Sequence, residues 1–72
     1  MDKEQIWIPA REVTESDENS FIYLKKEKVR NVFIYDATTY EKIAYKKEDM
    51  EKGILSIAYP YKDLVIDYEY VY

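Results

Sequence analysis

The chain of 72 residues contains no cysteine and no histidine, and both absences limit its chemistry. Without cysteine there can be no disulfide bond and no thiolate nucleophile. Without histidine the most common general base is missing, and so is the usual partner of a serine nucleophile. Zinc sites built from thiolates or imidazoles are excluded as well. We therefore predict a protein that is not an enzyme and that holds neither a cofactor nor a metal.

Glycine and proline are also scarce, with Gly53, Pro9 and Pro60 as the only examples. A single glycine cannot build a phosphate-cradling loop. The acidic segment 14–20 lacks the central glycine and the ligand spacing of a calcium loop. Disordered chains are poor in aromatic residues, whereas this chain is 47% hydrophobic and 17% aromatic. These features predict one small folded domain over residues 1–72.

Long apolar runs are absent, since no stretch approaches the roughly 18 residues of a membrane span. The opening sequence MDKEQIWIPA has two acids in its first four residues and does not resemble a signal peptide. We therefore expect a cytoplasmic protein with no membrane partner. The frequent Lys, Ile, Tyr and Glu residues are typical of AT-rich genomes, and we expect a phage or mobile-element origin.

Alternating apolar residues predict a mainly β fold. The expected strands are 5–9, 21–25, 29–36, 54–59 and 64–72. Pro9 favours an edge position for the first strand, because proline cannot donate to a central ladder. Residues 10–20 are polar and acidic and predict a loop. Residues 26–28 predict a turn that joins two strands into a hairpin. The strand 29–36 is apolar on both faces, which indicates a central position.

Residues 37–53 allow two interpretations. Thr38 and Glu41 have the spacing of a helical capping box, and Gly53 is placed as a C-terminal cap, so a helix over 38–52 is possible. Alternatively, Asp36 begins a turn that leads into a strand over 40–46. The fold class is therefore a small antiparallel sheet or an SH3-like or OB-like barrel of five to six strands, or an α+β fold with one helix.

The segment 59–72 contains five of the nine tyrosines. Strand alternation places its residues on two faces. One face carries Leu64, Ile66, Tyr68, Tyr70 and Tyr72, and the other carries Val65, Asp67, Glu69 and Val71. The first face is aliphatic at its start and phenolic at its end. We therefore expect Leu64 and Ile66 in the core, Tyr68 at the core margin, and the last two tyrosines near the rim.

Tyrosine and tryptophan are enriched in binding surfaces, which supports a partner protein rather than a substrate. The predicted partner-binding residues are Trp7, Tyr59, Tyr61, Asp67, Glu69, Tyr70 and Tyr72. The function expected from them is that of a small regulator or inhibitor of another protein. A homodimer through the C-terminal strand is one form of this hypothesis, because an exposed strand edge invites pairing. The alternative is that the tyrosines only close the core.

The net charge of −4 leaves two further hypotheses open. The acids of residues 2–18, together with Asp63, Asp67 and Glu69, could imitate nucleic acid and block a DNA- or RNA-binding enzyme. Conversely, the short basic segment could bind single strands weakly, with Tyr23 and Tyr35 stacking on bases. Its cations are Lys25, Lys26, Lys28 and Arg30. Because no dominant basic face is expected, nucleic acid is not our preferred partner.

Overall fold

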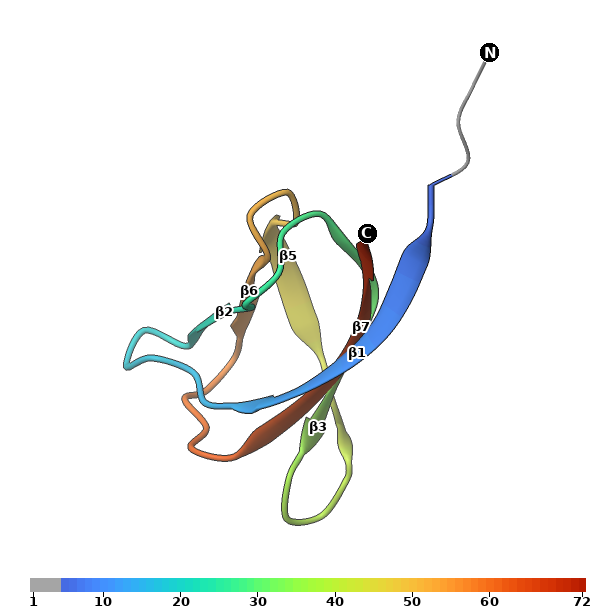
Figure 1. Cartoon of the computed structure of the whole chain (residues 1–72). Helices are drawn as coiled ribbons and strands as arrows, with labels where there is room; N and C mark the ends of the chain where they lie inside the picture. Colours follow the sequence, from blue (N-terminus) through green and yellow to red (C-terminus); the bar gives the residue numbers. More distant parts are fainter. Residues whose placement is uncertain (1–4) are drawn as a thin grey trace.

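The computed structural model describes residues 5–72 and contains seven β-strands and no helix in that range (Figure 1). The strands are β1 (Trp7–Thr14), β2 (Phe21–Tyr23), β3 (Val29–Asp36), β4 (Lys42–Ile43), β5 (Tyr45–Asp49), β6 (Ile54–Ile57) and β7 (Leu64–Val71). All strand pairs are antiparallel. The mainly β prediction is confirmed. Among the described residues there is no helix long and apolar enough to cross a membrane.

The strands form two small sheets that do not close into a barrel. The four-stranded sheet has the order β1-β7-β3-β4, and the three-stranded sheet has the order β2-β6-β5. The predicted hairpin between β2 and β3 is wrong, because β2 pairs with β6 and β3 pairs with β7. Residues 24–28 instead pass from one sheet to the other. Backbone hydrogen bonds from Leu24 to Gly53 and from Lys28 to Glu51 hold them against the β5–β6 turn.

The helix considered for 38–52 is wrong, because Asp36 directs the chain into a turn instead. Its side chain accepts a hydrogen bond from the backbone N–H of Thr38 at 2.7 Å, and its carbonyl accepts one from Tyr40 at 2.7 Å. Strands β4 and β5 follow and are separated only by Ala44. The strand expected over 40–46 is thus present in two pieces. Residues 42–49 therefore form the edge strand of both sheets, β4 in the four-stranded sheet and β5 in the three-stranded sheet. This division gives seven strands where five to six were predicted.

Gly53 lies in the turn between β5 and β6 and does not cap a helix. Its φ angle is +72°, in the left-handed region that favours glycine. A Cβ atom at this position would lie 2.4 Å from the carbonyl oxygen of Lys26. The only glycine of the chain therefore lets the β5–β6 turn approach the crossing segment 24–28.

The core lies between the two sheets and is mainly aliphatic. Its fully buried side chains are Ile22, Ile34, Leu55, Leu64 and Ile66. Tyr68 is only 3% exposed and belongs to this core, deeper than the margin expected from the sequence. Tyr70 is half-buried beside it, with the two ring centroids 6.4 Å apart. The change from aliphatic to phenolic along β7 is thus a change from the centre of the core toward its end.

The predicted loop over 10–20 is wrong in its first half, since β1 continues to Thr14. The inward positions of this part are Ala10 and Glu12, which are not large apolar residues and gave no strand signal. Glu12 is buried, and its carboxylate accepts hydrogen bonds from the Tyr68 hydroxyl and, at 2.9 Å, from the backbone N–H of Lys25. Burial raises the pKa of Tyr68, and the bond to Glu12 adds to this effect.

Strand β7 is central in its sheet and offers no free edge. It pairs over its whole length with β1 on one side and with β3 on the other. The exposed edge expected for the C-terminal strand is therefore wrong, because the backbone groups of β7 are already used inside the chain. The homodimer itself stays a prediction. The edge position expected for the strand that contains Pro9 is confirmed, since β1 borders the four-stranded sheet.

Candidate protein-binding surface

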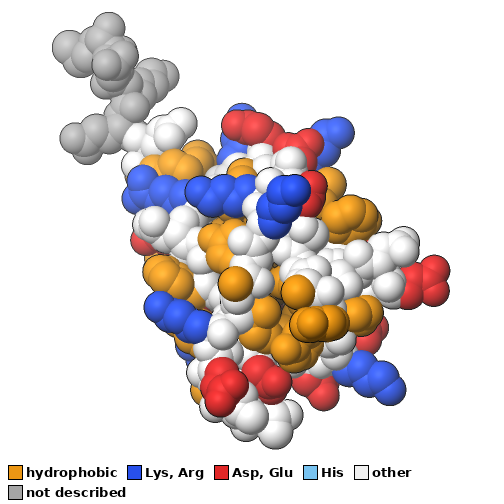
Figure 2. Space-filling model, turned by 180° about the vertical axis from the view of Figure 1, so that it is seen from behind, with side chains coloured by type: hydrophobic (Ala, Val, Ile, Leu, Met, Phe, Trp, Pro, Cys, Tyr) orange, Lys and Arg blue, Asp and Glu red, His pale blue; other side chains and the backbone are white. Residues whose placement is uncertain are grey.

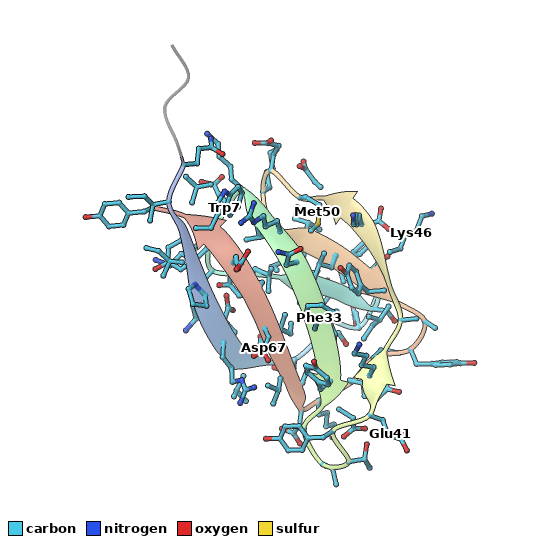
Figure 3. The ribbon with its side chains drawn as sticks, turned by 90° about the vertical axis from the view of Figure 1, so that its right-hand side faces the viewer. Trp7, Phe33, Glu41, Lys46, Met50 and Asp67 are labelled. Atoms are coloured by element: carbon cyan, nitrogen blue, oxygen red, sulfur yellow. The ribbon has the colours of Figure 1, made fainter. Side chains whose placement is uncertain are left out.

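The outer face of the four-stranded sheet, on the side away from the core, is the candidate site (Figure 3). Its side chains lie in cross-strand rows that follow the strand register. From one end to the other, the rows are Trp7 and Val71, then Pro9, Glu69 and Arg30, then Arg11, Asp67 and Phe33, and finally Val13, Val65 and Tyr35. The first and last of these four rows are mainly apolar. The second and third rows carry the charged side chains, and Phe33 lies in the third row.

A β-bulge in β3 places both Arg30 and Phe33 on this face. Residues three apart on a regular strand point to opposite faces. The register shift between Arg30 and Phe33 adds one residue, and Asn31 adopts a positive φ of 51° within it. The hydroxyl of Tyr45 donates a 2.9 Å hydrogen bond to the carbonyl of Val32 inside the bulge. The bulge thus aims a guanidinium and an aromatic ring at the same surface.

The first ion pair of this face joins β1 to β7. The Arg11 Nε donates to Asp67 Oδ1 at 2.6 Å, and Nη2 donates to Oδ2 at 2.9 Å. This two-point contact lowers the pKa of Asp67 and raises that of Arg11. Because Arg11 is exposed, the pair stays accessible to solvent and to a partner.

The second ion pair joins β3 to β7 next to the tryptophan. Glu69 Oε1 accepts hydrogen bonds from Arg30 Nε at 2.8 Å and from Asn31 Nδ2 at 2.9 Å. Both bonds lower the pKa of Glu69, and the bond from Arg30 lowers it more than the bond from Asn31. The guanidinium of Arg30 also stacks over the Trp7 ring, with its central carbon 3.9 Å from the ring centroid.

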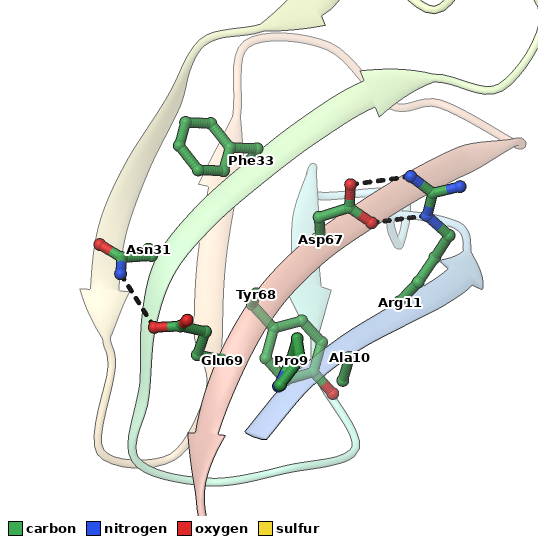
Figure 4. Close-up of a pocket in the computed structure, with 8 residues that line it drawn as sticks. All are labelled: Pro9, Ala10, Arg11, Asn31, Phe33, Asp67, Tyr68 and Glu69. Carbon is green, nitrogen blue, oxygen red and sulfur yellow. Dashed lines mark hydrogen bonds and ion pairs between the residues drawn. The ribbon is translucent and has the colours of Figure 1, made fainter. Parts of the chain in front are cut away.

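A shallow groove of about 500 Å³ lies between the two ion pairs (Figure 4). Its lining consists of Pro9, Ala10, Arg11, Asn31, Phe33, Asp67, Tyr68 and Glu69. Phe33 is 44% exposed and stands on one side of the groove, and the ammonium of Lys42 lies 5.0 Å from its ring centroid. No lining residue carries a hydroxyl nucleophile that is free, since the Tyr68 hydroxyl is bound to Glu12.

The predicted partner-binding residues do not form one surface. Trp7, Asp67 and Glu69 lie together on the outer face. Tyr59 and Tyr61 lie before the start of β7, at the opposite end of the sheet from Trp7. Tyr70 belongs to the inner face with Tyr68, where it packs against the core. Tyr72 follows the last strand and is 86% exposed.

Two of the four cations of the basic segment, Lys26 and Arg30, contact other side chains of the described chain. Arg30 is bonded to Glu69 and stacked on Trp7, and the Lys26 ammonium lies 4.8 Å from the Tyr70 ring centroid. The two tyrosines expected to stack on bases are separated, because Tyr23 is in the three-stranded sheet and Tyr35 is at the far end of β3. Lys25 and Lys28 are exposed on the crossing segment. This arrangement gives single-strand binding little support.

The acids proposed for nucleic-acid mimicry are also divided. Asp67 and Glu69 are paired with arginines on the outer face, so their charges are already compensated. Asp63 lies in the loop before β7. Among residues 5–72, no group of three or more acidic side chains is arranged to hold a metal ion. The mimicry hypothesis therefore has less geometric support than a mixed protein-binding face.

Six residues that line the groove were not among the predicted partner-binding residues: Pro9, Ala10, Arg11, Asn31, Phe33 and Tyr68. Extending the alternation of Trp7 through residue 13 would have placed Pro9 and Arg11 on one face. No such signal exists for Asn31, because a bulge breaks the period on which the method depends.

Comparison with known protein families, with curated proteins and with solved structures finds no match for this chain. The outer face must therefore be interpreted from its own chemistry.

Proposed function

We propose that this protein is a cytoplasmic, non-catalytic protein-binding module, a small regulator or inhibitor encoded by a phage or mobile element. Its binding surface is the outer face of the four-stranded sheet. The observation that carries this proposal is the composition of that face. It presents Trp7, Phe33 and Tyr35 beside two arginine–carboxylate pairs, and no strand of the described chain covers it (Figure 3).

Physical arguments favour a protein partner at this face. Exposed aromatic and arginine side chains are the residues that contribute most to protein interfaces. Here the bulge and the ion pairs hold Arg30 and Arg11 in fixed positions before any partner arrives. Fixed side chains lose little conformational entropy on binding, which increases affinity. The charges compensate one another, so the face can be covered without burying an unpaired charge.

The test is affinity capture from a lysate of the source organism, followed by binding measurements with the purified partner. Replacing Phe33 and Trp7 by alanine should weaken that binding by roughly tenfold or more for the pair, as expected when interface anchors are removed. Tyr23→Ala is the matched control, since Tyr23 is also an exposed aromatic residue but lies in the other sheet. Equal binding by the double variant and the wild type would remove this face from the proposal.

A further inference from the structure

Three loops are linked at the end of the four-stranded sheet where β7 begins: residues 58–63 lie between the loops 15–20 and 37–41 (Figure 1). Backbone hydrogen bonds join them, from Ser16 N to Tyr61 O at 3.0 Å and from Ala37 N to Asp63 O at 3.2 Å. The Ser16 hydroxyl also accepts a bond from the backbone N–H of Tyr61 at 2.8 Å. The loops therefore form one connected surface, distinct from the outer face that carries the proposed function.

A groove of about 270 Å³ opens on this surface between the β3–β4 turn and the 58–61 segment. Its lining consists of Asp36, Glu41, Lys42, Ile43, Ala44, Ala58, Tyr59 and Tyr61. The lining is apolar along Ile43, Ala44 and Ala58, where the chain passes from one sheet to the other. Tyr59 is 71% exposed, so one wall of the groove is an aromatic ring that no core contact requires.

The charge of the three loops and their neighbouring residues is mainly negative. The acids are Glu15, Asp17, Glu18, Asp36, Glu41 and Asp63, and the cations are Lys42 and Lys62. Figure 2 shows acidic side chains at the lower end of the molecule with Lys or Arg beside them, and a row of Lys and Arg near the upper end with further acidic side chains around it. The two ion pairs found within residues 5–72 are both on the outer face, not here.

Lys42 lines the groove without compensating its carboxylates. Its ammonium lies 5.0 Å from the Phe33 ring centroid, on the outer face of the sheet. The carboxylate of Asp36 is turned toward the backbone of Thr38 and Thr39, and no ion pair of Glu41 is present in the described chain. An incoming cation would therefore meet an aromatic wall and acids that no lysine or arginine of residues 5–72 has neutralised.

We propose that this groove binds a basic segment of a protein, with an arginine or lysine side chain on the Tyr59 ring and its charge toward Glu41 and Asp36. A cation over an exposed aromatic ring is attracted by the ring's quadrupole. The surrounding acids increase the association rate and select against acidic partners. The apolar residues at the Ala44 bend accept the aliphatic part of the same side chain. This site goes beyond the proposed function and does not depend on it.

The test uses the ¹⁵N-labelled protein and the blocked peptide acetyl-Gly-Arg-Gly-Arg-Gly-amide at low salt. The same peptide with citrulline in place of arginine keeps the shape and loses the charge. We expect chemical-shift changes at residues 40–44 and 58–61 with the arginine peptide, and much smaller changes with the citrulline peptide. Added salt should weaken the binding, because surface charges are screened.

Two pairs of variants sharpen this test. Tyr59→Ala should weaken peptide binding by roughly 3- to 10-fold, as expected for loss of a cation–π contact. Tyr72→Ala should not, because Tyr72 is also exposed but lies at the other end of the sheet. Glu41→Gln should weaken it, whereas Glu27→Gln should not. Equal binding of the citrulline peptide, or equal effects of the control variants, would overturn the proposal. Trp7→Ala should leave peptide binding unchanged, so either function can fail without the other.

Discussion

The inner and outer faces of β7 use polar groups in different ways. On the inner face the Tyr68 hydroxyl is buried and bonded to the Glu12 carboxylate. On the outer face Asp67 and Glu69 are paired with arginines that remain in contact with solvent. A buried polar contact is costly to break because the remaining partner loses its solvation. An exposed ion pair contributes little to the free energy of unfolding, because water and salt screen the attraction between its charges. We therefore expect the polar contacts of the inner face to contribute more to the stability of the fold than those of the outer face.

The largest expected effect comes from removing the inner tyrosine. Tyr68→Ala should lower the free energy of unfolding by roughly 3–5 kcal/mol, as other large-to-small core substitutions do. Tyr68→Phe keeps the ring and should cost only about 1–2 kcal/mol for the lost hydrogen bond. Urea denaturation followed by far-UV circular dichroism measures both. If Phe33→Ala on the outer face were as destabilising as Tyr68→Ala, the distinction between the faces would be wrong.

A smaller effect is expected at the carboxylate that accepts the tyrosine's bond. Glu12→Ala should lower the free energy of unfolding by about 1–3 kcal/mol, because the N–H of Lys25 and the hydroxyl of Tyr68 lose their acceptor. Glu15→Ala is the matched control, since Glu15 is exposed and follows the last residue of the same strand. The same denaturation experiment applies, and an equal loss in both variants would contradict the role given to Glu12.

The smallest effect on stability is expected for the ion pairs of the outer face. It is detected through the pKa values of their carboxylates rather than through the free energy of unfolding. The pKa values of Asp67 and Glu69 are lowered by Arg11 and Arg30. Their contribution to stability is therefore present above the unfolded pKa values, about 4 for such groups, and is lost as the pH falls through the lower folded values. Carboxyl ¹³C NMR titration should show both midpoints below the ordinary range. Arg11→Ala should move the midpoint of Asp67 upward and leave that of Glu69 unchanged.

Local patterns were sufficient to predict several elements. The alternation of 64–72 predicted β7 and its two faces, and the double apolar character of 29–36 predicted a central strand. These predictions succeeded because a period of two depends only on which side chains are buried. Pro9 likewise indicated an edge strand. Proline has no backbone N–H to donate to a neighbouring strand, and this can be read from the residue type alone.

Pairings between distant segments could not be predicted in the same way. The short interval between 21–25 and 29–36 favoured a hairpin, but β2 pairs with β6, which is about thirty residues away along the chain. The outer-face site depends on such pairings, because Arg11 meets Asp67 only when β1 lies beside β7. The end of β1 was missed because its buried acid is satisfied by Tyr68 and Lys25, which local sequence does not reveal.

The position of Glu12 has a consequence for misfolding. If β1 slipped by one residue along β7, every side chain would change faces, and Arg11 would enter the core without a carboxylate partner. Burying an unpaired charge costs several kcal/mol, so this off-register state is strongly disfavoured. A slip by two residues would keep the faces but present Ala10 or Thr14 to the Tyr68 hydroxyl, and neither has a carboxylate. One buried acid thus leaves the edge strand a single way to dock.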